Sequence, residues 1–593
     1  MHGLRRRRLL SAAAGALALV ALVALPASGA GKKERPVVGG AKLAHLSQGV
    51  SVRYWAANPH LAPAPFRERF EHVAEAASAA RKRSGKAAFG GKAPDVFNND
   101  DFGVPQNEES VGVCRTNDDI VLGGTNDYRG ILDEQGNFTG WHFSNDGGRT
   151  LTNEGLLPPV PLLSDHETEV PSGGDPVDVI GAGCATYAAS LAYDPSDPFG
   201  NSNGIAVYKS DPATLATCDT AFPNSANPAC WPIRRLVVEG VGSPEPTPAT
   251  PGHFLDKEWM DVGVSGAAGE VVWVTYSDFA ATGPGDFDFS AEIFAVRCDA
   301  ADLDPCTAPI PISVDDFDVQ FSDVTIAPDG RVYVTWSEII GELPDDPDCP
   351  QPDGCAGQTF VHKLRIAEPG STTFGRERVV YREEKAIPFG GALHANDFRI
   401  ATYPKNDVAI LNGHPRIFVT WDACRFRPLE TICEESLIKL VYSDDDGKTW
   451  SNVIELSVGG DNYFPSIAAN DDPVRPLLAF AWFTNREDAV FHNRQLIEVL
   501  SLDPKNPTAE PHGRRRQLLP RLENESEADP LLGGFFIGDY IEVAALDDEA
   551  IVHYNANYRS VQLLGPLGIE GVPVPQQDNY LNRVRFRAQS GRR

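Results

Sequence analysis

The stretch Ser443-Asp444-Asp445-Asp446-Gly447-Lys448-Thr449-Trp450 has an imperfect twin at Ser144-Asn145-Asp146-Gly147-Gly148-Arg149-Thr150-Leu151. Both octapeptides follow the pattern S-x-D-x-G-x-T-[W/L] after a short apolar or aromatic run. The aspartate can accept hydrogen bonds from backbone N–H groups and the glycine can adopt a positive φ, which predicts a hairpin turn. The positions with this structural role are Ser144, Asp146, Gly148 and Thr150, and Ser443, Asp445, Gly447, Thr449 and Trp450. Two copies of one pattern indicate a repeat fold; the alternative is a pair of ordinary Asp/Gly hairpins.

The start of the chain has the features of an export signal. Arg5–Arg8 precede an apolar run, Leu9–Leu25, and the small residues Ser28-Gly29-Ala30. This pattern predicts a secretory signal peptide over residues 1–30, with twin-arginine export as the alternative route. No later stretch approaches about 18 uninterrupted apolar residues, so we expect no membrane span in the mature, secreted chain.

Residues 31–104 differ in composition from the remainder and are interpreted as an N-terminal extension and linker. Pro65–Lys86 is rich in Ala, Glu, Lys and Arg and predicts a helix. Val50–Trp55 has the alternating character of a strand that could complete a blade elsewhere. Residues 105–593 form the repeat domain.

The formal net charge of the chain is −30. Loss of the four leader arginines takes it to about −34, which disfavours nucleic acid and anionic lipid as partners. The acidic loops 315–318 and 345–348 make structural calcium compatible with the composition, although solvated loops explain them as well. No cofactor and no metal-ligand set are expected from the sequence.

All ten cysteines follow the signal peptide, and most form close pairs in the sequence. An even number at short spacings in an exported chain predicts disulfides that staple loops. The expected pairs are Cys218/Cys230, Cys298/Cys306, Cys349/Cys355, Cys424/Cys433 and, by remainder, Cys114/Cys184. Metal binding is the alternative for Cys349 and Cys355, but no histidine pair accompanies them.

Short strand-like segments recur at intervals of 80, 69, 64, 76, 67 and 74 residues. Their heads are Ser110-Val111-Gly112, Ser190-Leu191-Ala192, Trp259-Met260-Asp261, Asp323-Val324-Thr325, Arg399-Ile400-Ala401, Ser466-Ile467-Ala468 and Tyr540-Ile541-Glu542. A second apolar strand follows most heads, for example Val271–Tyr276, with a weaker member at Gly204–Tyr208. Repeats too small to bury their own faces predict a closed radial array, here an all-β propeller of seven blades. It has six blades if the weak second repeat is an insertion, and a series of β-sandwich modules is the other alternative.

The octapeptides resemble the Asp-box (BNR) repeat of sialidases and related β-propellers. The resemblance extends over about residues 105 to 590, and Asp256-Lys257-Glu258-Trp259 and Gly538-Asp539-Tyr540 also look like family segments. It implies that the octapeptides are rim turns between the third and fourth strands of a blade. In this frame, starts of innermost strands and ends of second strands share one face of the propeller. Charged and aromatic residues recur at those positions, which predicts a binding site at the mouth of the central channel.

Sialidases use three arginines for the substrate carboxylate, a tyrosine nucleophile with a glutamate partner, and an aspartate acid/base, so the resemblance defines candidate roles. The candidate catalytic residues are Asp127 or Asp278 as acid/base, Glu338, and Tyr540, with Tyr128 as an alternative nucleophile. The candidate substrate-binding residues are Arg129, Asp256, Lys257, Trp259, Arg399, Asp422, Arg486, Asp539 and Arg559. The F-R-I-P signature of sialidases is absent from the start of the repeats, and its nearest counterpart is Phe398-Arg399-Ile400-Ala401.

Two function classes follow from the sequence. One is a monomeric, secreted, exo-acting glycoside hydrolase that uses extracellular glycans or glycoconjugates. The other is a non-catalytic propeller that binds glycan or protein through the same mouth. Convergence of the arginines on one point discriminates between a sialidase and the other possibilities.

Overall fold

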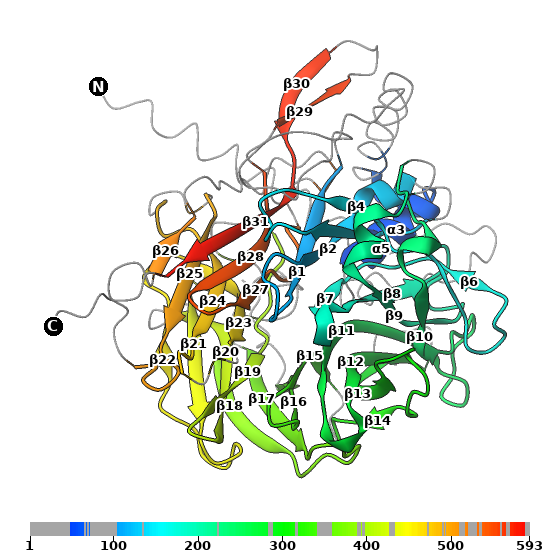
Figure 1. The fold of residues 1–593 in the computed structure, drawn as a ribbon. Coiled ribbons are helices and arrows are strands. Elements are labelled where there is room, and N and C mark those ends of the chain that lie inside the picture. The colour runs from blue at the N-terminus through cyan, green and yellow to red at the C-terminus, as the bar shows by residue number, and fades with distance from the viewer. Residues whose placement is uncertain are drawn as a thin grey trace, which may run out of the picture.

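Seven antiparallel sheets are arranged around a central channel, which confirms the predicted seven-bladed propeller (Figure 1). The structure is a computed structural model and describes residues 48–64, 67, 70 and 104–586. Within the last range it does not describe 133–135, 222–224, 283–288, 315–317, 341–357, 388–392, 394–397, 426–432, 434, 471, 473, 489–491, 493, 509–515, 520–530, 533–535, 558–559 and 565–569. The predicted signal peptide, Arg559, and most of Pro65–Lys86 and of the acidic loops lie outside the described residues.

Six blades have four strands each. Blades 1 and 2 contain β1 (Gln106–Val113), β2 (Val121–Asp127), β3 (Thr139–Ser144) and β4 (Asn153–Leu156), and β7 (Val177–Ile180), β8 (Thr186–Tyr193), β9 (Asn203–Ser210) and β10 (Ile233–Gly240). Blades 3 and 4 contain β11 (Gly252–Val264), β12 (Glu270–Ala281), β13 (Phe289–Asp299) and β14 (Ile310–Pro311), and β15 (Val319–Ile326), β16 (Val332–Ile340), β17 (Gln358–Ala367) and β18 (Arg378–Ala386). Blades 5 and 6 contain β19 (Lys405–Leu411), β20 (His414–Arg425), β21 (Glu435–Ser443) and β22 (Ile454–Glu455), and β23 (Asn462–Ala469), β24 (Leu478–Thr484), β25 (Leu496–Leu502) and β26 (Arg516–Leu518).

Blade 7 consists of β27 (Glu542–Ala545), β28 (Glu549–Ala556) and β31 (Asp578–Arg585). The hairpin β29 (Ser560–Leu564) and β30 (Glu570–Pro575) is a separate sheet that projects from the propeller (Figure 1). A ribbon of β5 (Val160–Pro161) and β6 (Glu169–Val170) links blades 1 and 2. The described helices are α3 (Gln48–Ala57), α5 (Pro212–Thr217) and the short 3-10 turns η1 (Tyr128–Leu132), η2 (Ala182–Cys184), η3 (Pro228–Cys230) and η4 (Gly266–Ala268). None of these helices is long and apolar enough to cross a membrane.

The two octapeptides form the expected turns between the third and fourth strands of blades 1 and 5. In the second turn the Ser443 hydroxyl donates to Asp445 (2.9 Å) and accepts from the N–H of Gly447 (2.8 Å). The Asp445 carboxylate accepts from the backbone and the hydroxyl of Thr449, each at 2.8 Å. The first turn repeats this hydrogen-bond pattern with Ser144, Asp146, Gly148 and Thr150. The octapeptides are therefore structural turns, as the sequence predicted.

The expected strand order was wrong in blades 2 and 5. The innermost strand of blade 2 is β7, whereas the predicted head Ser190-Leu191-Ala192 lies in β8 and Gly204–Tyr208 lies in the third strand, β9. The innermost strand of blade 5 is β19, which begins six residues after Arg399. In both blades a buried apolar segment next to the innermost strand has the same pattern of hydrophobicity as the strand itself. The pattern alone therefore predicted that this neighbouring segment, and not β7 or β19, is the innermost strand.

The segment Val50–Trp55 forms helix α3 and not the expected strand. Val50, Ser51, Val52 and Arg53 are all at least 98% buried. The helix therefore has no solvent-exposed polar side, and its sequence lacks the helical period of polar and apolar residues by which a helix is recognised. Arg53 donates to the carbonyl of Gly136 (2.6 Å), and its guanidinium lies over the ring of Tyr193. Helix α3 thus packs on blades 1 and 2 of the propeller (Figure 1).

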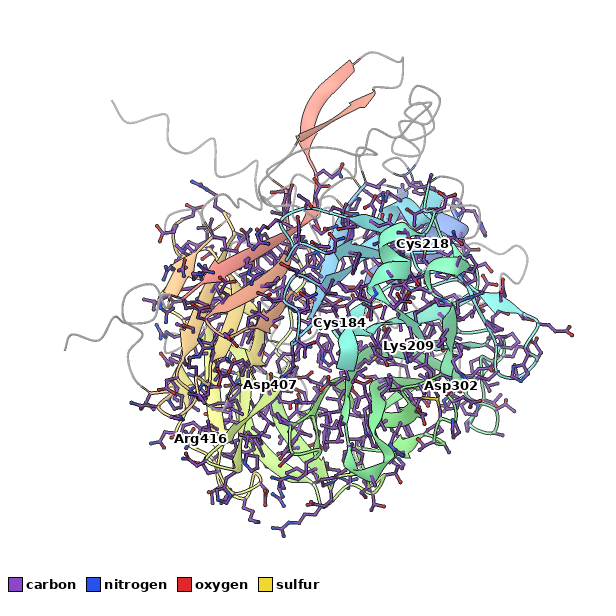
Figure 2. All side chains as sticks on the ribbon, in the orientation of Figure 1. Cys184, Lys209, Cys218, Asp302, Asp407 and Arg416 are labelled. Atoms are coloured by element: carbon purple, nitrogen blue, oxygen red, sulfur yellow. A yellow bond between two sulfur atoms is a disulfide. The ribbon has the colours of Figure 1, made fainter. Side chains whose placement is uncertain are left out.

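A belt of hydrogen bonds joins innermost strands of neighbouring blades. In most of these contacts a buried carboxylate of one blade accepts from a backbone N–H of the next; Asp407, labelled in Figure 2, accepts from Ala469 (2.7 Å). The other contacts are Asp261 with Ile326, Asp323 with Asn406, Ser466 with Val543, Glu542 with Val111, and Asp178 with the hydroxyl of Ser110. The belt holds the innermost strands, and therefore the channel wall, in a fixed register.

Four of the expected disulfides are present: Cys114–Cys184, Cys218–Cys230, Cys298–Cys306 and Cys424–Cys433. The fifth expected disulfide stays a prediction, because Cys349 and Cys355 both lie in 341–357, outside the described residues.

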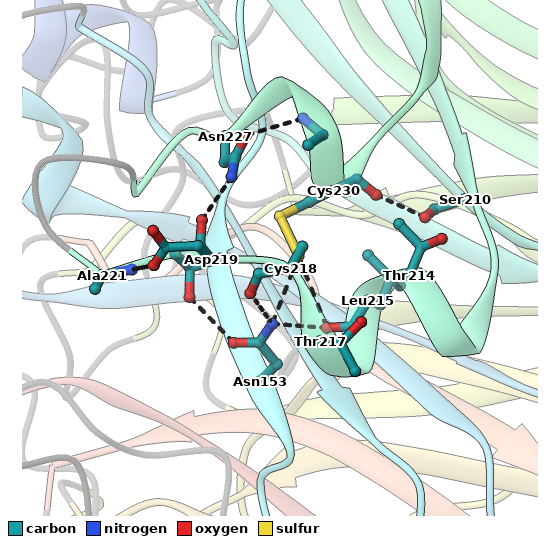
Figure 3. Close-up of a disulfide and its surroundings, with 12 residues drawn as sticks. Asn153, Ser210, Thr214, Leu215, Thr217, Cys218, Asp219, Ala221, Asn227 and Cys230 are labelled. Carbon is teal, nitrogen blue, oxygen red and sulfur yellow. Dashed lines mark hydrogen bonds between the residues drawn. A yellow bond between two sulfur atoms is a disulfide. The ribbon is translucent and has the colours of Figure 1, made fainter.

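Figure 3 shows the disulfide Cys218–Cys230, which closes the loop between the C-terminal end of α5 and η3. Asn153 of β4 donates to the carbonyls of Leu215 (2.6 Å) and Cys218 (3.1 Å). This disulfide therefore fixes a loop of blade 2 against the outer strand of blade 1.

Candidate functional site

The innermost strands share an unusual backbone feature. In blades 1, 3, 4 and 6, two residues bulge out of the pairing with the second strand. The first residue of each bulge has a positive φ: 61° at Glu108, 55° at Lys257, 60° at Phe321 and 54° at Phe464. Such conformations are uncommon for residues with a side chain, and bulges of this kind are frequent next to active sites. Asp175 in blade 2 also has a positive φ, of 53°.

The bulges of blades 3 and 4 and residues from blades 2, 5 and 7 enclose a cavity of about 40 Å³ in the channel. The lining residues are Asp175, Lys257, Glu258, Trp259, Phe321, Ser322, Tyr403, Pro404, Lys405, Asp539 and Tyr540. Because one water needs roughly 10–15 Å³ by this measure, the cavity has room for a few waters or a small chemical group. A sugar ring would have to lie at its mouth.

One side of the cavity contains an ion triad. Asp539 accepts from Arg399 Nε (3.0 Å) and from Lys257 Nζ (3.4 Å). Burial acts to raise the pKa of Asp539, but the charges of Arg399 and Lys257 outweigh it and hold the pKa below its usual value. Asp539 is therefore ionised at neutral pH.

The neighbouring Glu108 behaves in the opposite way. Burial, and after it the negative charges of Asp175 and Asp539, raise the pKa of Glu108 well above its usual value. The carboxyl groups of Glu108 and Asp175 are hydrogen-bonded to each other, as two carboxyl groups can be only when one carries a proton. Asn126 donates to Glu108, and its Oδ1 accepts from the backbone of Asp175 (2.9 Å). We refer to Glu108 and Asp175 as the carboxyl pair.

Aromatic rings form the other side of the cavity. Trp259 and Tyr540 make an edge-to-face contact with centroids 5.5 Å apart, and Phe321 stacks on Tyr403 at 4.8 Å. The ammonium group of Lys405 lies over the ring of Trp259. Burial lowers the pKa of Lys405 to about 8, against the opposite effect of Asp323 and Glu542.

The cavity brings together several of the sequence-predicted residues. Lys257, Trp259, Asp539 and Tyr540 line it, and Arg399 is held by Asp539. Asp256 is fully buried next to Lys257, whose backbone N–H donates to the Asp256 carboxylate (2.9 Å). The Tyr540 hydroxyl donates to the carbonyl of Pro176 (2.9 Å), and burial raises the pKa of Tyr540 well above its usual value. In this state Tyr540 is a neutral phenol.

Other candidates do not line the cavity and have partners of their own. Asp127 is paired with Arg129, which also contacts Glu154. Asp278 accepts from His253 (2.9 Å), and Glu338 is paired with Lys363 (3.0 Å). Arg486 is paired with Glu498 (2.9 Å), and Asp422 accepts from the backbone of Phe464 (3.2 Å). Arg129, Arg399 and Arg486 thus have separate carboxylate partners, and no shared point of convergence.

Sequence reasoning missed Asp175, Tyr403 and Lys405, because the innermost strands of blades 2 and 5 were assigned incorrectly. One signal was available: Tyr403-Pro404 in blade 5 repeats Phe464-Pro465 in blade 6. Aligning these two pairs would have placed Lys405 opposite Ser466 and Tyr403 at the bulge position. No group of three or more His, Cys, Asp or Glu residues in the described part of the chain could hold a metal ion.

No protein-family model and no curated protein matches the sequence. Among solved structures, the chain is similar to a protein of unknown function from Dyadobacter fermentans (11% identity, TM-score 0.39, covering 69% of this chain and 94% of that one). It is also similar to an α-L-arabinofuranosidase from Fusarium graminearum (11%, 0.36, 68% and 95%) and to a mutant Trypanosoma rangeli sialidase that displays trans-sialidase activity (13%, 0.36, 72% and 56%). A likeness at this level concerns general architecture and carries no argument about activity.

Proposed function

We propose that the protein hydrolyses glycosidic bonds in extracellular glycans at the channel cavity. The observation that supports this proposal is the opposite shift of two neighbouring carboxyl centres: the pKa of Glu108 in the carboxyl pair is raised, and that of Asp539 is lowered. Hydrolysis of a glycosidic bond needs one carboxylic acid that keeps its proton near neutral pH and one ionised carboxylate.

Asp175 lines the cavity, so it is the member of the carboxyl pair that can reach a substrate. In the proposed reaction the proton held by Glu108 passes to Asp175, which gives it to the leaving oxygen as the glycosidic C–O bond breaks. Ionised Asp539 stabilises the positive charge that develops on the anomeric carbon. A water molecule supplies the hydroxyl group to that carbon, and its remaining proton returns to the carboxyl pair, which restores the starting state.

The substrate that suits this site is not a sialoside. Arg399 is the arginine that adjoins the cavity, and Asp539 already neutralises it. Arg129 and Arg486 are likewise paired with carboxylates of their own blades. A neutral glycan, or one that the carboxyl group of Glu258 can bind, therefore fits this site better than an anionic one. The predicted signal peptide supports glycans outside the cell as substrates, and the four disulfides are typical of an oxidising compartment.

The test is a panel of fluorogenic glycosides, first sialosides and then neutral and amino-sugar glycosides, with the purified protein. We expect turnover in the second group and a loss of about 100-fold or more in kcat for Asp175→Asn, as for removal of a general acid. The matched comparison is Asp127→Asn, at the acid position suggested by the sequence. If Asp127→Asn abolishes turnover and Asp175→Asn does not, the assignment of the carboxyl pair is wrong.

A non-catalytic glycan-binding propeller is the second candidate. The observation that favours it is the small cavity, about 40 Å³, whose charged lining residues Lys257 and Asp539 are already paired with each other. Glycan binding without turnover of any glycoside in the panel would establish this alternative in place of hydrolysis.

A further inference from the structure

Glu258 is a buried acid that the proposed reaction does not use. It occupies the second position of the β11 bulge, lines the cavity and is 97% buried. Its own backbone N–H interacts with the carboxyl group, and among the described residues no group of another residue is hydrogen-bonded to either carboxyl oxygen. A buried carboxyl group with so few partners is costly, so this one can accept a ligand.

Next to Glu258 the cavity has the form of an aromatic cage. The Lys405 ammonium lies over Trp259 and is 5.9 Å from the ring centroids of both Tyr403 and Tyr540. Cations are attracted to the faces of such rings, most strongly to tryptophan, and sets of rings of this kind bind ammonium groups. Lys405 shows that the cage of Trp259, Tyr403 and Tyr540 accepts a cation.

The charges around Glu258 also favour a cation. Asp175 and Asp256 act on Glu258 as negative neighbours and Lys257 as a positive one, and Lys257 is already engaged by Asp539. Burial, followed by Asp175, raises the pKa of Glu258 well above its usual value, which favours the protonated form of Glu258. Tyr540, which also interacts with it, is a neutral phenol, and Lys405 is a second cation in the cavity lining. A cation entering the cavity would therefore ionise Glu258 and release a proton.

We propose that the cavity binds an ammonium group of the ligand, between the carboxyl group of Glu258 and the rings of Trp259 and Tyr540. The identity of the ligand as a glycan rests on the proposed function; with it, the substrate class is a glycan that carries unacetylated amino sugars. The volume of about 40 Å³ matches this inference, because it suits an ammonium group and leaves the sugar ring at the mouth.

Isothermal titration calorimetry with glucosamine, N-acetylglucosamine and glucose tests this inference without reference to turnover. We expect glucosamine to bind about tenfold or more tightly than the two neutral sugars. Its apparent binding heat should depend on the ionisation enthalpy of the buffer, because Glu258 releases a proton. Equal binding of the three sugars, no binding of glucosamine, or a heat that is the same in all buffers would overturn the proposal.

Two variants locate the site. Glu258→Gln should lose most of the preference for glucosamine, whereas Glu109→Gln should keep it. Glu109 is the matched control because it has the equivalent bulge position in β1, is buried and does not line the cavity. Lys405→Met should bind glucosamine about tenfold more tightly, since the competing cation is removed. An unchanged or weaker affinity of Lys405→Met contradicts the cage, even if Glu258→Gln does not fold.

Glycoside turnover is measured separately. Preferred binding of glucosamine with no hydrolysis of amino-sugar glycosides would leave the cation site in place and disprove the proposed hydrolysis. Hydrolysis of neutral glycosides with no preference for glucosamine would disprove the cation site and leave the proposed hydrolysis in place.

Discussion

The positive φ angles of Glu108, Lys257 and Phe321 have an energetic cost that neighbouring contacts must offset. A residue with a side chain in this region costs on the order of 1 kcal/mol or more. At Glu108 and Lys257 the cost is offset by bonds that the bulge makes possible: Asn126 donates to Glu108, and Lys257 reaches Asp539. The bulge turns both side chains into the channel, where an ordinary strand would alternate them between its two faces. The unusual backbone is thus what assembles the charged side of the cavity.

The ion triad makes Asp539 a sensitive position. We expect Asp539→Asn to lower the free energy of unfolding by about 3–5 kcal/mol, because it leaves Arg399 and Lys257 buried without their shared carboxylate. Urea unfolding followed by tryptophan fluorescence measures this change. The control is Asp444→Asn, at an exposed aspartate paired with Arg416, for which we expect less than about 1 kcal/mol. Similar losses for both variants would show that the triad contributes no special stability.

At the scale of the element, the octapeptide turns show which features of this fold are local. Each turn depends on hydrogen bonds within eight residues, so its geometry and its place between third and fourth strands could be predicted from sequence. The innermost strands depend instead on which segment packs against the channel. That choice is decided by contacts between blades, such as the bond from Asn406 to Asp323 in blade 4, which leave no local pattern.

Within each turn the serine hydroxyl is a central hydrogen-bonding group, as Ser443 shows. Its hydroxyl is buried and serves three partners, including the N–H of Gly447. We expect Ser443→Ala to cost about 1–3 kcal/mol, because that N–H loses its acceptor in a buried position. Ser144→Ala should behave in the same way, and the exposed Ser196→Ala should be near neutral. Chemical denaturation of the three variants gives the comparison; a neutral Ser443→Ala would mean that solvent replaces the hydroxyl.

The residues of the channel cavity were predicted in part, because the innermost strands of some blades were assigned correctly and those of blades 2 and 5 were not. Lys257, Trp259, Asp539 and Tyr540 belong to short segments that occur at the heads of correctly placed repeats, so sequence reasoning brought them to the channel. Asp175 and Lys405 were missed with the strands that carry them. The roles suggested for Asp127, Glu338 and Asp278 depended on resemblance, and these side chains lie instead in ion pairs or hydrogen bonds of individual blades. The spacing of the repeats predicts where a strand ends, but it does not predict which residue a side chain at that position contacts.

At the scale of the whole molecule, the belt of buried carboxyl groups links stability to pH. Burial raises the pKa of Asp178 and Asp261 to about 7 and that of Glu542 to about 8. A raised carboxyl pKa stabilises the folded state below the unfolded pKa of about 4, and this contribution is lost as pH rises through the folded value. Buried His362 and His553, with lowered pKa values, act oppositely, but only below about pH 6.5.

We therefore expect the thermal midpoint of unfolding to fall steadily from about pH 6.5 to about pH 8.5. Over this range the histidines no longer contribute, and the belt carboxylates ionise inside the folded ring. Differential scanning calorimetry at constant ionic strength measures the trend. Glu542→Gln should reduce the slope, whereas a midpoint that does not fall over this range would show that the belt carboxyl groups are already ionised at its lower end.

The seam between the first and last blades has a consequence for biosynthesis. Gln106 and Asn579, 473 residues apart in the chain, share a buried hydrogen bond of 2.6 Å, and His553 contacts the carbonyl of Ser110 (2.8 Å). At roughly 5–20 residues per second, blade 7 is completed about 25–95 s after the start of blade 1, and until then blade 1 lacks its contact with blade 7. During that interval the edge of β1 is open to other chains, and its bulge with the acidic residues Glu108 and Glu109 makes it a poor template for aggregation. The bulge that carries Glu108 in the finished channel thus protects the nascent chain before the ring exists.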